Sequence, residues 1–69
     1  MDVTVPMVGK IVNVLVSVGD SVKENDPVAT LEAMKMEMPV VAPGGGVVKA
    51  INVNAGDEVT SDTILMVIE

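Results

Sequence analysis

Apolar and polar residues alternate with a period of two along much of the chain, which is the period of a β-strand with one buried face. In one of these segments we expect Ile51, Val53 and Ala55 to point inward, with the intervening asparagines facing water. No segment has an apolar period of 3.6 residues supported by helix caps. The pattern predicts an all-β chain with strands within residues 2–5, 10–18, 28–32, 40–42, 51–55 and 63–69.

Turn signals separate the predicted strands. Two Gly-Asp pairs, at residues 19–20 and 56–57, are typical of tight turns. Asn25 is expected to take a left-handed backbone conformation, and Asp62 has the same tolerance. Together with the alternating segments named above, these turns divide the chain into about eight short strands. We expect these strands to form two sheets that close on each other.

The two halves of the chain repeat. Residues 1–32 lie over residues 38–69 without a gap when the first half is shifted by 37. Neither copy is long enough to bury its own apolar face, so we expect the two copies to pack together with approximate two-fold symmetry. Residues 33–37, here called the central segment, join them and have Lys35 at their centre. Identical pairs are Met1/Met38, Val3/Val40, Pro6/Pro43, Gly9/Gly46, Val16/Val53, Gly19/Gly56, Asp20/Asp57, Val22/Val59 and Glu32/Glu69.

Composition limits the chemistry that the chain can perform alone. Its 69 residues predict one small domain, and 16 valines and 4 isoleucines suit a pleated, half-buried surface. Phe, Tyr, Trp, His and Cys are all absent. The chain therefore lacks the usual general base, the thiol nucleophile and the best metal ligands. We expect no catalytic residues and no metal site.

The charge of the chain narrows the set of partners. A net charge of −6, with four lysines and no arginine, argues against nucleic acid and against direct contact with an acidic membrane surface. No apolar run approaches the roughly 18 residues of a spanning helix, and residues 1–20 lack the features of a signal peptide. The expected location is cytoplasmic.

The central segment is unusual for a hairpin turn. It could be an ordinary tip, in which Lys35 keeps an apolar turn soluble. However, it contains none of the Asn, Gly, Asp or Pro residues that tight turns favour. Met34 and Met36 flank the single amine of Lys35. Solubility of the turn does not explain two long apolar side chains, whereas contact with another protein does, because methionine adapts to several partners.

Residues 32–37, Glu-Ala-Met-Lys-Met-Glu, resemble the biotin attachment motif of the biotinyl carrier domains in the biotin/lipoyl attachment family. The resemblance covers the whole chain, through Pro6-Met7-Val8-Gly9, Gly-Asp-x-Val at residues 19–22 and Gly-Asp-Glu-Val at residues 56–59. It implies a flattened barrel of two four-stranded antiparallel sheets with quasi-two-fold symmetry. It also implies that residues 1–69 form one biotinyl carrier domain, with pseudo-repeats 1–32 and 38–69.

By the same resemblance, Lys35 carries covalent biotin as N6-biotinyl-lysine, and Glu32, Ala33, Met34, Met36 and Glu37 shape the turn or are recognised by partners. The implied partners are a biotin protein ligase and the biotin carboxylase and carboxyltransferase or decarboxylase components of a multi-component enzyme. The arm would carry a carboxyl group between their active sites, and the isolated domain is expected to be a monomer. An amine is nucleophilic only when neutral, so deprotonation is left to the ligase.

Some features depart from the family pattern. Val8 and Met38 stand where related sequences often have Pro and Asn, and the segment from Val16 to Val22 is too short for the protruding thumb of some bacterial acetyl-CoA carboxylase carriers. Two alternatives remain open. The chain could be a lipoyl carrier of an oxo-acid dehydrogenase, although such domains usually have an acidic residue before the lysine and a small one after it. It could also be an unmodified barrel that serves as a structural adaptor.

Overall fold

The computed structural model of the chain describes residues 1–69, and all its regular elements are β-strands. The structure has no helix with the length and hydropathy that crossing a membrane requires. The eight strands are β1 (Asp2–Val3), β2 (Gly9–Val14), β3 (Ser21–Val22), β4 (Pro27–Ala33), β5 (Met36–Val41), β6 (Gly46–Ile51), β7 (Glu58–Val59) and β8 (Met66–Ile68).

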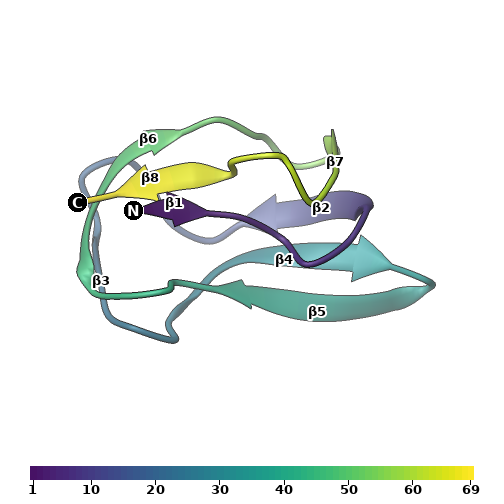
Figure 1. The fold of residues 1–69 in the computed structure, drawn as a ribbon, viewed down its shortest axis with the longest axis horizontal. Helices are drawn as coiled ribbons and strands as arrows, with labels where there is room; N and C mark the ends of the chain where they lie inside the picture. Colours follow the sequence, from purple (N-terminus) through teal and green to yellow (C-terminus); the bar gives the residue numbers. More distant parts are fainter.

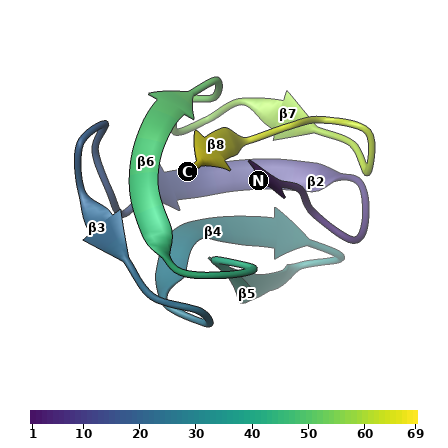
Figure 2. The same cartoon turned by 60° about the vertical axis from the view of Figure 1, so that its left-hand side comes forward.

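The strands form two four-stranded antiparallel sheets that face each other. One sheet has the order β1-β8-β6-β3 and the other β5-β4-β2-β7. Figure 2 shows β6 passing in front of β2 and β4, and the two sheets make the layers of a flattened barrel. The turn between β4 and β5 lies at one end of the molecule, and both chain termini lie at the other (Figure 1). The predicted fold class is confirmed.

The 37-residue repeat is present in the strand pairing itself. Each strand of the first sheet has a counterpart 37 residues away, later in the chain for β1 and β3 and earlier for β8 and β6. Replacing β1, β8, β6 and β3 by these counterparts gives β5, β4, β2 and β7, which is the order of the second sheet. The register follows the same rule, since Val48 lies opposite Ile68 and, 37 residues earlier, Ile11 lies opposite Leu31. The predicted quasi-two-fold symmetry is therefore confirmed.

The core fills the space between the sheets with small and medium aliphatic side chains. Nothing polar or charged is buried in it. Because β-branched residues have few rotamers to lose, a core rich in valine suits so small a chain. The sixteen buried residues are Val3, Val5, Ile11, Val22, Val28, Ala29, Leu31, Ala33, Val40, Ala42, Val48, Val53, Val59, Leu65, Met66 and Ile68.

Two irregularities correct the predicted strand pattern. The strand expected over residues 10–18 ends at Val14, and its register shifts between Ile11 and Asn13. At such a bulge an extra residue is left unpaired, so Val12 and Asn13 both face outward and the inward side passes from Ile11 to Val14. The prediction that Ala55 points inward is also wrong, because the strand has ended and the residue is exposed beside the turn at Gly56.

The turns also follow the repeat, with one correction. Asp20 and Asp57 each accept a hydrogen bond from the backbone N–H three residues earlier, at 2.9 and 2.8 Å. Asn25 has a φ of 70°, so its left-handed conformation is confirmed. Asp62 is not left-handed, although its turn keeps the side-chain hydrogen bond of the first copy: Thr63 accepts from Thr60 N–H at 3.0 Å, as Asp26 accepts from Lys23 N–H at 2.9 Å.

Candidate functional site

Lys35 lies in a two-residue hairpin turn. Strands β4 and β5 pair from Pro27 opposite Val41 as far as Ala33 opposite Met36, which leaves only Met34 and Lys35 to join them. Their φ angles are 54° and 63°. Positive φ at both central residues defines a type I′ turn, whose twist matches that of the flanking strands. The turn holds Lys35 at the tip of the longest hairpin of the molecule (Figure 1).

The backbone of this turn is strained by its own sequence. Type I′ turns favour Asn-Gly because side chains other than Asn and Asp rarely adopt the left-handed region. A left-handed conformation costs an ordinary L-residue about 1–2 kcal/mol. Met34 and Lys35 adopt it because six residue pairs between β4 and β5 fix the ends of the turn. Strain that persists in this way is concentrated at functional sites.

The predicted recognition residues fall on different sides of the hairpin. Met34 is 87% exposed and Met36 is 65% exposed, so both thioether side chains are available to a partner. Lys35 is exposed between them. Ala33 is buried in the core, which leaves space for only a small side chain at that position. The structure thus gives Ala33 a packing role and places Lys35 and the two methionines at the surface.

The two glutamates of the motif belong to a longer row of charges. Glu32 lies directly opposite Glu37 on β5 and opposite Lys10 on β2, and Lys10 lies opposite Glu58 on β7. All four side chains are exposed, and directly opposed residues share one face of a sheet. We call Glu37, Glu32, Lys10 and Glu58 the charged row. It runs across the sheet directly behind the hairpin turn.

Lys10 and Glu58 were not among the site residues expected from the sequence. They are distant from the central segment in the chain and lie outside the attachment motif at residues 32–37. The signal that could have identified them is the strand register, because antiparallel pairing brings residues 10 and 58 level with Glu32. That register is not apparent until the strands are paired.

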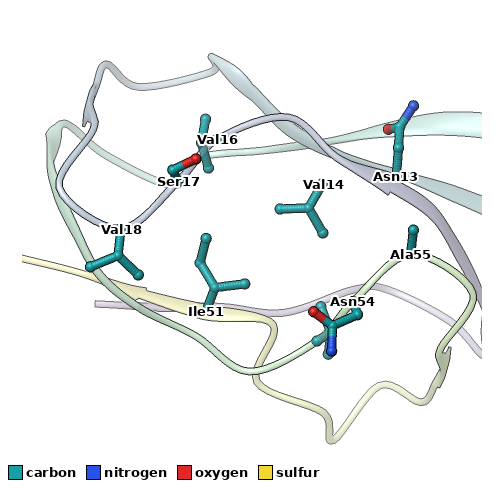
Figure 3. A pocket seen from close by; sticks show the side chains of 9 residues that line it. Asn13, Val14, Val16, Ser17, Val18, Ile51, Asn54 and Ala55 are labelled. Carbon is teal, nitrogen blue, oxygen red and sulfur yellow. The ribbon is translucent and has the colours of Figure 1, made fainter.

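The largest cavity lies away from the hairpin. It has a volume of about 480 Å³ and is lined by residues from the 13–18 and 51–55 segments. Its walls are related by the repeat, since the lining includes Val14 and Val16 together with Ile51 and Val53, their counterparts 37 residues later. Val14 and Ile51 lie across the cavity from each other (Figure 3). The cavity therefore opens around the pseudo-two-fold axis, where the two copies meet, and contains no charged side chain.

The chemistry available at the hairpin is that of one primary amine. An amine is a nucleophile once it has lost its proton, and it can then accept an acyl group. The chain contains no His or Cys that could act as base or nucleophile beside Lys35. The site can therefore accept a covalent group from another protein and hold it out at a rigid turn.

Comparison with known proteins identifies relatives over the whole chain. Residues 1–68 match the family described as "Biotin-requiring enzyme". The chain is 51% identical over 63 residues to the biotin carboxyl carrier protein of Streptococcus mutans, covering 91% of this chain and 48% of that protein. It is 39% identical over 66 residues to the biotin/lipoyl attachment protein of Bacillus subtilis, covering 96% and 90% of the two chains.

Solved structures share the fold. The urea carboxylase of Kluyveromyces lactis matches with a TM-score of 0.92 and 33% identity, covering all of this chain and 6% of that chain. The lipoyl domain of the 2-oxoglutarate dehydrogenase complex from Azotobacter vinelandii matches with a TM-score of 0.82 and 27% identity, covering 100% and 95%. The chain spans about half the length of the Streptococcus mutans carrier protein. Because the family match extends over residues 1–68, this chain belongs to the biotin/lipoyl attachment family.

Proposed function

We propose that the chain is a biotin carboxyl carrier in which biotin is attached to Lys35. The observation that carries the proposal is the β4–β5 turn, where the Lys35 amine is exposed between two exposed methionines. A two-residue turn fits a covalent arm, because the paired strands hold its ends and Lys35 is exposed at its tip.

In the attachment step, the Lys35 amine attacks the carboxyl carbon of biotin that a biotin protein ligase has activated. A C–N amide bond forms, the bond to the leaving group breaks, and the amine loses a proton to a base of the ligase. The chain itself supplies presentation and no acid or base. It is therefore a carrier component and not an enzyme, in agreement with its similarity to a biotin carboxyl carrier protein.

When bound, biotin would supply a ureido nitrogen that accepts and releases a carboxyl group. Tethering raises the effective concentration of that group at each active site the arm can reach. The partners in this proposal are a biotin carboxylase and a carboxyltransferase or decarboxylase. Met34 and Met36 present adaptable apolar surface to them, and Glu32 and Glu37 lie on the face behind.

The second candidate is a lipoyl carrier, since lipoyl domains are also similar to this chain. Both arms attach to a lysine through the same amide, so the fold cannot separate them. The residues beside the lysine favour biotin, because lipoyl domains usually have an acidic residue before it and a small one after it. Here both neighbours are methionine.

The experiment offers the purified chain to a biotin protein ligase and, separately, to a lipoate ligase, each with its acid and ATP. Intact mass measures the product, and Lys35→Arg is the control because it keeps the charge and removes the nucleophile. The proposal expects one biotinyl increment, no lipoyl increment at the same enzyme concentration, and no increment in Lys35→Arg. A faster reaction with lipoate would assign the arm to lipoic acid instead.

A further inference from the structure

The repeat provides an internal comparison between the two ends of the molecule. The bend from Pro6 to Gly9 leads into β2, and its counterpart leads into β6 from Pro43 to Gly46. Both bends end in a glycine that touches backbone, since an added Cβ would lie 2.6 Å from the Glu32 carbonyl oxygen at Gly9 and 2.8 Å from that of Glu69 at Gly46. The two bends therefore make the same close approach.

The bends differ in the residue just before that glycine. Val8 occupies this position in the first copy, and its counterpart 37 residues later is Gly45. The second copy forms the same bend with glycine, so the bend itself needs no side chain at this position. Val8 is nonetheless 69% exposed, and so contributes little to the core. A single exposed valine is ordinary on a protein surface, so the significance of Val8 depends on whether it extends a larger apolar surface.

The position of Val8 indicates that it does. The antiparallel register of β2 with β4 ends at Lys10 opposite Glu32, and Val8 lies two residues beyond this pair, on the side of the β4–β5 turn. The close contact between Gly9 and the Glu32 carbonyl oxygen fits the same register. The bend and the β4–β5 turn lie at the same end of the molecule in both views (Figures 1 and 2). Val8, Met34 and Met36 therefore provide exposed apolar surface around Lys35.

The charge beside this apolar surface indicates the chemistry of its partner. The charged row has three carboxylates and one amine, so its formal charge is −3 + 1 = −2. At the other end of the molecule, the counterparts of Lys10 and Glu58 are the uncharged Val47 and Ser21. Glu32 is repeated as Glu69, but Lys10 and Glu58 have no charged counterparts, so the complete row occurs only at the Lys35 end. A partner that covers this end would match it with an apolar surface bordered by basic groups.

We propose that Val8 is a recognition residue for the enzyme that acylates Lys35, which contacts it together with Met34 and Met36. The enzyme must approach this end because the acceptor amine lies there. This inference rests on the proposed function, and it adds to the attachment motif a residue that is 27 positions away in the sequence.

The test compares Val8→Ala with Val18→Ala in biotinylation by a biotin protein ligase. Val18 is a matched control because it is also a valine in a connecting segment, is 61% exposed, and lies beyond the other end of β2 (Figure 1). We expect kcat/KM to fall about tenfold for Val8→Ala, since two buried methyl groups are lost from the contact. Val18→Ala should retain the parent value. Val8→Ile should retain most of it, because isoleucine keeps a branched apolar side chain at this position.

Melting curves of all three variants establish that each is folded at the assay temperature. A Val8→Ala rate within twofold of the parent overturns the inference and leaves the proposed function intact. An equal fall in Val8→Ala and Val18→Ala also overturns it, because the effect would not depend on the Lys35 end. A parent chain that accepts no biotin overturns the proposed function, and the inference with it.

Discussion

Glu32 and Glu37 lie directly opposite each other across β4 and β5, and a single residue pair, Ala33 and Met36, separates them from the turn that carries Lys35. Like charges in this arrangement destabilise a sheet by a few tenths of a kcal/mol to about 1 kcal/mol. We expect Glu37→Lys to stabilise the fold by about 0.5 kcal/mol at low salt, because it turns the repulsion into an attraction at an exposed site. Urea unfolding at low ionic strength measures the change.

Glu24→Lys is the control, because it makes the same change of charge in a loop outside the strands. The gain of Glu37→Lys over this control should shrink as the salt approaches roughly 1 M, where charges are screened within about 3 Å. A gain that is independent of salt would show that the repulsion between the two glutamates is not its cause.

The strained turn predicts a substitution that stabilises the protein at the expense of recognition. Met34 has a φ of 54°, and asparagine adopts this conformation at lower cost. Met34→Asn should raise stability by about 1 kcal/mol, or the melting temperature by roughly 4–8 °C. The same variant should be biotinylated more slowly, because an exposed apolar contact is lost. Thermal melting and the acylation rate check the two parts.

The control for this variant is Met36→Asn, which places the same residue in β5, where φ is negative. It should gain no stability, because there is no left-handed strain to relieve. Equal stabilisation by both substitutions would mean that the turn geometry does not limit stability.

Gly9 is predicted to tolerate no side chain. A Cβ there would lie 2.6 Å from the Glu32 carbonyl oxygen and 2.8 Å from a methyl carbon of Leu31, so β2 and β4 would have to separate. Gly9→Ala should destabilise the protein by about 1–3 kcal/mol. Gly45→Ala is the matched control, because its nearest neighbour would be 3.5 Å away. Denaturant unfolding should separate the two variants, and equal stabilities would contradict the close packing of β2 on β4.

The charged row predicts that biotinylation depends on salt. The row and the net charge of −6 should attract a basic surface of the ligase, so kcat/KM should fall as ionic strength rises. The double variant Glu32→Gln/Glu37→Gln should show a weaker dependence. Initial rates over a salt series measure both slopes. Rates of the parent that do not change with salt would exclude an electrostatic contribution to docking.

The sequence predicted much of the fold because one signal, the 37-residue repeat, constrained all of it. Two copies that must pack together leave few arrangements, and Lys35 falls at their junction in any of them. Asn25 was also predictable, since its left-handed conformation depends on the residue itself.

The features that were missed depend on cross-strand partners. The change of the inward side from Ile11 to Val14 follows from a bulge against β4, and nothing in the run of valines signals it. Lys10 and Glu58 join the charged row only through the register of β2 with β4 and β7. The type I′ turn was not predictable from Met-Lys, because the flanking strand pairs impose it against the preference of the residues.

The central claim is that Lys35, among four lysines, is the acceptor of biotin. The most direct test is peptide mapping by tandem mass spectrometry of the chain purified from cells that co-express a biotin protein ligase. The account predicts a single biotinyl group on Lys35 and none on Lys10, Lys23 or Lys49. A biotinyl group on one of those three lysines, or none anywhere on the chain, would contradict it.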